Sequence, residues 1–178
     1  MARLKVIEPE QAEGKAKELF EGPFKDMHIN IFKGMANSPA VLEAYLGMEK
    51  ALSQGLLTAK EREVIMLTVG EANKCDYCVS AHTMLGKQAG LSEEETIAAR
   101  KGELTNPKLA AVATFASALH EKKGWVSDDD LAAFRNAGYT DGHIAEVVAN
   151  YVLSTFTNYF NHVNETDVDV PAAPALTT

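Results

Sequence analysis

Two cysteines and a histidine stand in a spacing that can carry redox chemistry. The chain has 178 residues and two cysteines, Cys75 and Cys78, and His82 follows four positions after the second. A thiolate three positions from a second thiol can attack an oxidant and then be captured as a disulfide without large movement of the chain. An imidazole on the same helical face can move the proton at physiological pH. This spacing predicts a dithiol peroxidase or a disulfide oxidoreductase.

The cysteine pair is expected at the start of a helix. Asn73 and Lys74 predict a break before Cys75, and the residues after it have helical spacing. Unsatisfied backbone N–H groups and the positive end of the helix dipole then lie next to both sulfurs and favour a thiolate. Within that helix Cys78 and His82 are an i, i+4 pair and therefore neighbours.

His82 needs a partner to orient it, and two carboxylates precede it. Glu63 lies twelve residues before Cys75 on the preceding predicted helix, and it reaches His82 if the two helices pack antiparallel. Glu71 lies four residues before Cys75 and shares its stripe if the helix is unbroken. Spacing alone does not decide which carboxylate is the partner of His82, because each one is equally well explained as a surface residue.

Two other interpretations of the cysteine pair compete with a redox role. The pair and His82 supply three zinc ligands, and His28, His120, His143 or His162 can be considered as a fourth. Zinc knuckles usually lie in loops between short elements, however, and this motif opens a helix. A purely structural disulfide would close a loop too short to add much stability, in a compartment where thiols are normally kept reduced.

The composition excludes several classes of partner. The net charge is −8, with 25 acidic and 17 basic residues, and no basic face of the size that nucleic acid requires is visible. No apolar run approaches the roughly 20 residues of a membrane span. The segment 1–5 leads directly into charged residues, so we expect no signal segment and a cytoplasmic location.

Helical capping and periodicity signals occur along the whole chain, which predicts an all-α fold. Residues 1–166 are expected to form one domain, and 167–178, with two prolines and several small residues, a tail that is flexible or lies on a neighbouring subunit. Capping and periodicity signals place the helices at residues 9–20, 39–52, 59–69, 76–89, 93–102, 107–123, 128–137 and 141–162.

The last predicted helix carries two further signals. Its Thr155-x-x-Asn158-x-x-x-His162 spacing repeats that of the cysteine motif, which raises a duplicated helical unit as one origin of the fold. It also gathers aromatic residues, which predicts a homo-oligomer held by apolar helix faces. These aromatic residues are Tyr151, Phe156, Tyr159 and Phe160.

The segment from Glu63 to His82, with Cys75-Asp-Tyr-Cys78 inside it, resembles the core of AhpD-like alkylhydroperoxidases of the carboxymuconolactone decarboxylase superfamily. The resemblance is strongest over residues 57–90. The ending Phe156-Thr-Asn-Tyr-Phe-Asn-His162 is similar to the peroxidase-related subgroup. The family resemblance implies an AhpD-like helical bundle that assembles as a trimer or hexamer.

The resemblance also implies a role for each site residue. Cys78 would attack hydrogen peroxide or an organic hydroperoxide, and Cys75 would resolve the sulfenic acid as a disulfide. His82 and Glu63 would form a proton relay, so the resemblance favours Glu63 over Glu71 as the partner of His82. Tyr77 departs from the histidine that the best-known members carry between the cysteines, so we expect an altered rate or donor preference rather than lost chemistry.

By the same resemblance, the reducing equivalents come from an external dithiol, a lipoyl-bearing or thioredoxin-like protein, and no metal, haem or flavin is implied. The decarboxylase branch lacks the cysteine pair, so lactone decarboxylation is not expected. The alternative function is a redox-sensing disulfide switch or interaction module without significant peroxidase turnover.

Overall fold

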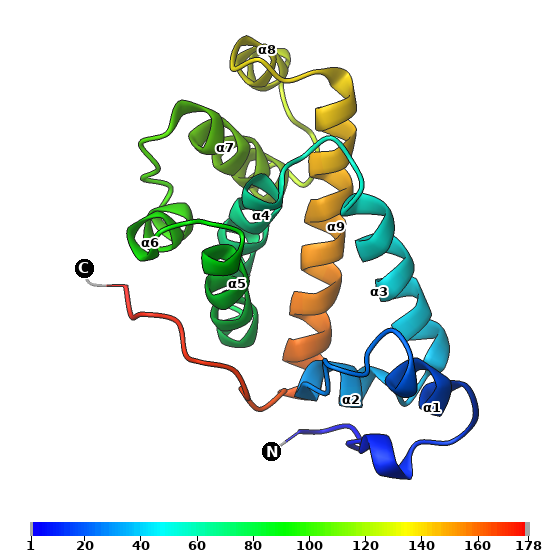
Figure 1. Cartoon of the computed structure of the whole chain (residues 1–178). Coiled ribbons are helices and arrows are strands. Elements are labelled where there is room, and N and C mark those ends of the chain that lie inside the picture. The colour runs from blue at the N-terminus through cyan, green and yellow to red at the C-terminus, as the bar shows by residue number, and fades with distance from the viewer. Residues whose placement is uncertain (1, 177–178) are drawn as a thin grey trace.

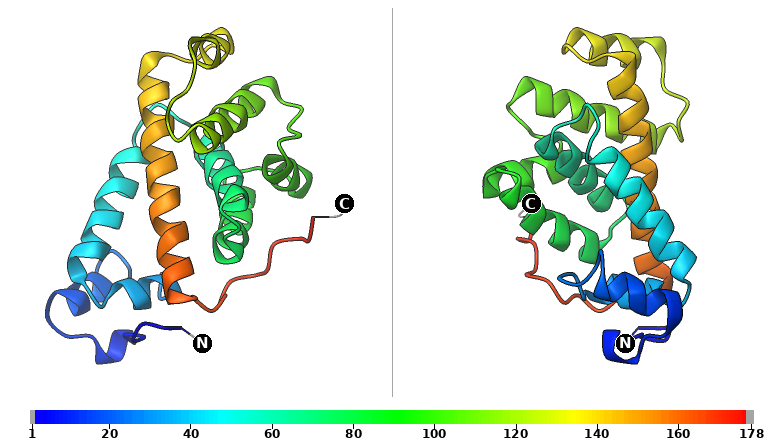
Figure 2. Two further views of the ribbon diagram at one scale, coloured as in Figure 1. Left: turned by 180° about the vertical axis from the view of Figure 1, so that it is seen from behind. Right: turned by 45° about the vertical axis from the view of Figure 1, so that its right-hand side comes forward.

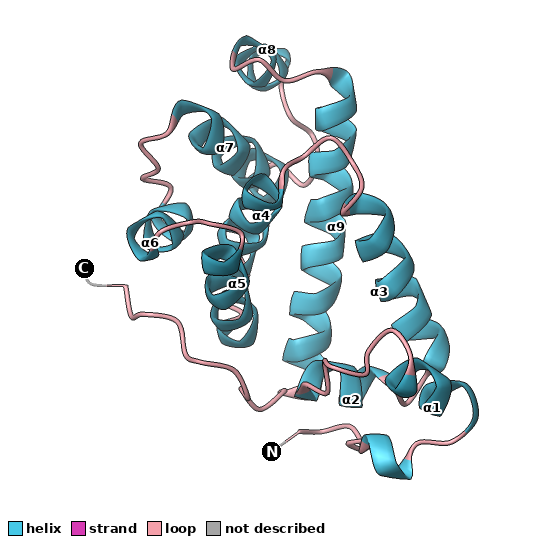
Figure 3. Ribbon diagram, in the orientation of Figure 1, coloured by secondary structure: helices cyan, strands magenta, loops and turns pink. Residues whose placement is uncertain are grey.

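The chain folds into helices arranged around one long central helix. The structure is a computed structural model that describes residues 2–176, and within these residues it has nine α-helices, one 3-10 helix and no strand (Figures 1 and 3). The expected all-α fold is confirmed. The elements are the 3-10 helix η1 (Pro9–Gln11), α1 (Gly14–Glu21), α2 (Asn30–Met35), α3 (Pro39–Leu52), α4 (Ala59–Ala72), α5 (Asp76–Gln88), α6 (Glu93–Lys101), α7 (Pro107–Glu121), α8 (Asp128–Asn136) and α9 (Asp141–Asn164).

Helix α9 separates two groups of helices. Helices α1 to α3 lie on one side of it and α4 to α7 on the other, and the views from two further directions in Figure 2 show the same division. Helix α4 packs against α5, α6, α7 and α9. One apolar core lies among α4, α6, α7, α8 and α9, and a second lies among α1, α2 and α3. The second core includes both cysteines, so the dithiol lies where the two groups meet.

The start of α4 is fixed by a buried carboxylate. Thr58 and Glu61 form the reciprocal pair of hydrogen bonds known as a capping box. The other carboxylate oxygen of Glu61 accepts a hydrogen bond of 2.5 Å from the Tyr139 hydroxyl. Burial of the Glu61 carboxyl group opposes its ionisation, but the hydrogen bonds from Tyr139 and Thr58 outweigh burial and lower its pKa. This anchor holds the first turn of α4, the turn that also carries Glu63.

Two expectations for the N-terminal half are wrong in detail. The single helix expected over 9–20 is interrupted, because Glu13 is extended and Gly14 has φ of +52°, in the left-handed region where glycine is favoured. The short helix α2 was not predicted, since six residues are too few to show a helical period. The remaining helices lie within a few residues of their expected bounds.

The last residues run extended beside α5. We use the name strap for residues 167–176, which leave the end of α9 and pass α5 towards the C-terminus (Figure 1). Its backbone and side chains contact α2, α5 and α6 of the same chain. A role for this tail on a neighbouring subunit stays a prediction. None of the described helices has the length and apolar character needed to cross a membrane.

Candidate active site

Two glycines let α4 and α5 pack closely and antiparallel. A Cβ atom on Gly70 of α4 would lie 3.2 Å from a Val79 methyl and 3.6 Å from Cβ of Cys78. At the other end, a Cβ on Gly86 of α5 would lie 3.7 Å from Cβ of Glu63. The antiparallel packing on which Glu63 depended is therefore present.

The two cysteines form a buried disulfide at the start of α5. Lys74 has φ of +56°, and this turn ends the preceding segment so that Cys75 becomes the N-cap residue of α5. Its Sγ accepts a hydrogen bond of 3.3 Å from the Cys78 backbone N–H. Cys75 and Cys78 are bonded to each other, and they are only 2% and 3% exposed. This geometry confirms the expected position of Cys75 at a helix N-terminus.

His82 and Glu63 are in direct contact across the α4–α5 interface. Nδ1 of His82 lies 2.8 Å from Oε2 of Glu63, and both side chains are partly buried. A carboxylate accepts a hydrogen bond, so Nδ1 carries the proton in the neutral ring. Nε2 is then left as the basic nitrogen.

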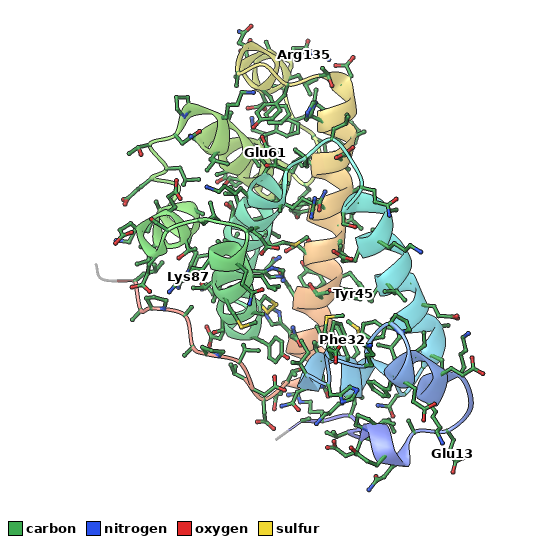
Figure 4. All side chains as sticks on the ribbon, in the orientation of Figure 1. Glu13, Phe32, Tyr45, Glu61, Lys87 and Arg135 are labelled. Atoms are coloured by element: carbon green, nitrogen blue, oxygen red, sulfur yellow. A yellow bond between two sulfur atoms is a disulfide. The ribbon has the colours of Figure 1, made fainter. Side chains whose placement is uncertain are left out.

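A cavity of about 430 Å³ connects these groups. Cys78, His82, Glu63 and Tyr77 all line it, which brings four of the expected site residues to one space. Phe32 of α2 and Tyr45 of α3, both labelled in Figure 4, line it from the N-terminal side. The remaining lining is mostly apolar, with Met27, Ile29, Ile31, Leu52, Met66, Ala81, Met84, Leu85, Leu153 and Val170. Such a cavity can hold a small organic molecule beside the Cys78 sulfur.

Asn161 is a site residue that the sequence did not reveal. Its side-chain Nδ2 donates to Sγ of Cys78 at 3.3 Å and lies 4.0 Å from Sγ of Cys75. Asn150 and Asn161 both line the cavity, and neither Oδ1 atom has a hydrogen-bond partner within the described protein. The available signal was the run of polar residues in an otherwise apolar helix, all of them buried. These are Asn150, Ser154, Thr157, Asn158, Asn161 and Asn164.

Tyr77 is buried and held by polar groups of two other segments. Its hydroxyl donates to Oδ1 of Asp169 at 2.8 Å and lies 3.4 Å from the Ile31 backbone N–H, a long contact. The other oxygen of Asp169 accepts from the Asn30 backbone N–H at 2.8 Å. Burial, followed by the hydrogen bond to Asp169, raises the pKa of Tyr77, so its phenol stays protonated at neutral pH.

Glu71, the second candidate partner of His82, lies elsewhere. Its carboxylate accepts from Nε of Arg100 at 2.8 Å, on the side of α4 that faces α6. Glu71 therefore serves as an ion-pair partner between helices. Among the described residues, no group of three or more histidine, cysteine, aspartate or glutamate side chains is arranged to hold a metal ion.

Comparison with known proteins agrees with this geometry. Residues 39–121 match the Carboxymuconolactone decarboxylase family. An uncharacterized protein of Haemophilus influenzae is 42% identical over 45 residues, a segment that spans 25% of this chain and 40% of that relative.

Solved structures extend the likeness to nearly the whole chain. A peroxidase-related protein of Ralstonia eutropha JMP134 with an alkylhydroperoxidase AhpD core has a TM-score of 0.84 at 22% identity, over 94% of this chain and 92% of that one. A peroxidase-related protein of Silicibacter sp. TM1040 has a TM-score of 0.80 at 19% identity, over 93% and 91%. The debrominase Bmp8, as a cysteine-to-alanine variant in complex with 2,3,4-tribromopyrrole, has a TM-score of 0.75 at 16% identity, over 95% and 94%.

These likenesses define an all-α protein with the AhpD-like fold and a cysteine pair at a helix N-terminus. Residues 39–121 thus match the carboxymuconolactone decarboxylase family, and the fold of the chain is AhpD-like.

The contact between Asn161 and Cys78 predicts a measurable effect on thiol reactivity. In a Cys75→Ser background, Asn161→Ala removes an N–H donor from the Cys78 thiolate and should raise the pKa of the thiol. We expect alkylation of Cys78 by iodoacetamide at pH 7 to slow by roughly threefold to tenfold. Asn158→Ala, one turn earlier on α9 and bonded to Asn73 instead, is the matched control. Equal alkylation rates in the two variants would show that the amide has no influence on the thiolate.

Proposed function

We propose that the protein is a thiol-dependent peroxidase that reduces hydrogen peroxide or organic hydroperoxides through a Cys75–Cys78 dithiol cycle. The observation that carries this proposal is the shared cavity: Cys78 lines it, Cys75 does not, and the His82–Glu63 pair lines it beside Cys78. A substrate in this cavity can therefore reach one sulfur and one general acid at the same time.

In the first step the Cys78 thiolate attacks one peroxide oxygen. The S–O bond forms, the O–O bond breaks, and Cys78 becomes a sulfenic acid while the other oxygen leaves as an alkoxide or hydroxide. Nε2 of His82 first takes the proton of the Cys78 thiol, and Glu63 stabilises the resulting imidazolium through Nδ1. Nε2 then gives this proton to the leaving group. The amide of Asn161 stabilises the attacking thiolate.

In the second step Cys75 gives up its thiol proton and attacks the sulfenic sulfur, the S–S bond forms, and the sulfenic hydroxyl takes up that proton and leaves as water. The result is the disulfide present in the structure. An external dithiol, lipoyl-bearing or thioredoxin-like, then returns the pair to thiols and becomes a disulfide itself. Each turnover thus moves two electrons from the donor to the peroxide.

The mostly apolar cavity favours a second candidate reaction. A volume of about 430 Å³ greatly exceeds what hydrogen peroxide needs, and the similarly folded Bmp8 debrominase binds a tribromopyrrole. The same dithiol can donate two electrons to a brominated aromatic ring: a thiol proton replaces bromine on the ring carbon, bromide and the second proton leave, and the Cys75–Cys78 disulfide forms. Bromide release from 2,3,4-tribromopyrrole, compared with consumption of cumene hydroperoxide by the same sample, distinguishes the two.

The cycle assigns different roles to the two cysteines. With excess dithiothreitol, the natural chain should consume cumene hydroperoxide in stopped-flow measurements, and Cys78→Ser should fall to the background rate. Without dithiothreitol, Cys75→Ser should consume one equivalent of hydroperoxide and leave a sulfenic acid on Cys78 that dimedone labels in the mass spectrum.

Dimedone labelling of Cys75 in the Cys78→Ser variant would reverse the roles. Reversible oxidation of the pair in a natural chain that shows no catalytic turnover would instead support a redox switch.

Glu63 and His82 should act as one relay. Glu63→Gln and His82→Ala should each slow the peroxide step by roughly tenfold or more, the low end of acid–base contributions. Because both changes interrupt the same proton transfer, the double variant should be little slower than the slower single variant.

Glu71→Gln serves as a control for the relay, since Glu71 is bonded to Arg100 and should leave the step unchanged. Effects of Glu63→Gln and His82→Ala that multiply in the double variant would separate the two residues.

We also propose that the protein is a homo-oligomer, a trimer or hexamer, held through α9. Of the four aromatic residues of α9, Phe156 and Phe160 pack against the core among α1, α2 and α3. Tyr151 packs against the core among α4, α6, α7 and α8, and Tyr159 is exposed. With about 100° per residue, the exposed apolar residues of α9 fall within about 60° of one another and form one stripe. They are Val148, Val152, Tyr159 and Val163.

Covering this stripe by a second copy predicts that sedimentation velocity at micromolar concentration finds a species larger than a monomer. Val152→Glu should shift it to smaller species, because a charge would be buried in the contact. Val6→Glu, at an exposed valine outside this stripe, should not. A natural chain that sediments as a monomer would rule the assembly out.

A further inference from the structure

The disulfide is closed off from bulk solvent although it must be reduced in every turnover. Cys75 and Cys78 are 2% and 3% exposed in the structure. Val170 of the strap lines the same cavity as Cys78, so the strap forms part of the wall between the sulfur and solvent. A small thiol can approach Cys78 inside the cavity, whereas a thiol on the surface of a folded protein meets the strap first.

Hydrogen bonds hold the first half of the strap beside the cysteine pair. Asp169 accepts from the Tyr77 hydroxyl and from the Asn30 backbone N–H, each at 2.8 Å. Asn30 in turn donates through Nδ2 to the Asp167 carbonyl at 3.0 Å. Because Tyr77 stands between the two cysteines, this contact joins the strap to the redox motif itself.

Backbone hydrogen bonds hold the second half of the strap. The Ala173 N–H donates to Oγ of Ser80 on α5 at 3.1 Å, and the Pro174 carbonyl accepts from Nη1 of Arg100 at 2.7 Å. The Arg100 side chain is almost fully buried and is held by Glu71, so it is a fixed anchor.

The strap is nevertheless easy to displace. None of residues 167–176 is buried, so few apolar contacts oppose its release. Its two hydrogen bonds with Asn30 are exposed and the other three are only partly buried, and segments of this kind open at a low free-energy cost.

We propose that the strap restricts access to the Cys75–Cys78 disulfide and thereby selects its reductant. The hydrogen bond between Asp169 and Tyr77 contributes most to holding the strap in place. Small dithiols reduce the closed form through the cavity, and a protein dithiol reduces the form in which the strap has lifted. The inference rests on the proposed dithiol cycle, because only a pair that is re-reduced by an external donor requires such control.

The step under control is thiol–disulfide exchange. A donor thiolate attacks Sγ of Cys78, the Cys75–Cys78 bond breaks, and Cys75 leaves as a thiolate next to the helix N-terminus. The second donor thiol then displaces Cys78 from the mixed disulfide. The donor loses two electrons and becomes a disulfide, and the pair gains them.

The test measures reduction of the fully oxidised, full-length protein by two donors of different size. Dithiothreitol and a reduced thioredoxin are each mixed with the protein, samples are quenched with an alkylating reagent, and reduced Cys75 and Cys78 are counted by mass. No peroxide is present. A failed peroxidase assay therefore bears on the proposed function and leaves this measurement intact.

The variants loosen the strap at two separate points. Asp169→Ala should speed reduction by thioredoxin by roughly tenfold, since two hydrogen bonds to a carboxylate are lost, and change reduction by dithiothreitol less than about twofold. Ser80→Ala, which leaves the fastening at Tyr77 in place, should speed reduction by thioredoxin by roughly threefold. Asp128→Ala on α8 is the matched control and should change neither rate.

The ratio of the two rates decides the outcome. A ratio of thioredoxin to dithiothreitol rates that rises in both strap variants supports the proposal. Equal acceleration of both donors would mean that the substitutions alter the disulfide itself. Unchanged rates with thioredoxin would mean that the strap does not limit access. Either of these results overturns the proposal.

Discussion

The close approach of α4 and α5 is the constraint on which the site depends. Gly70 and Gly86 remove the side chains that would hold the helices apart, at points opposite Cys78 and Glu63. At the resulting separation, a hydrogen bond of 2.8 Å joins Glu63 to His82. A Cβ at Gly70 would press on a Val79 methyl at 3.2 Å, whereas a Cβ at Gly86 would press mainly on Leu91 at 3.1 Å and would only touch Cβ of Glu63.

The cysteine pair lies in the apolar core formed with α1, α2 and α3, and this placement explains its environment. The N-terminal part of the chain supplies apolar walls to the cavity together with Asp26 and Glu49, α4 and α5 supply Glu63 and His82, and α9 supplies amides. Buried amides are costly unless they are hydrogen-bonded. The unpartnered Oδ1 atoms of Asn150 and Asn161 at the cavity are therefore groups that a bound substrate can satisfy.

Tyr77 links the redox motif to two distant parts of the chain. Its hydroxyl meets Asp169 of the strap and lies near the backbone of α2, so the residue between the cysteines also organises the cover of the cavity. Proteins that share this fold include peroxidase-related proteins and a debrominase. In this chain α2, α3 and the strap contribute cavity lining from outside the two helices that carry Glu63, His82 and the cysteine pair.

The sequence by itself determined what depends on residues close together in the chain. The helices, the capping box of Thr58 and Glu61, and the place of Cys75 at the start of α5 all follow from local hydrogen bonding and helical period. Spacing left Glu63 and Glu71 open, the family resemblance favoured Glu63, and the α4–α5 packing brings Glu63 into contact with His82. The contacts of Cys78 with Asn161 and of Tyr77 with Asp169 join residues 83 and 92 positions apart. Only the tertiary structure decided these, because side-chain contacts between distant segments leave no periodic trace in the sequence.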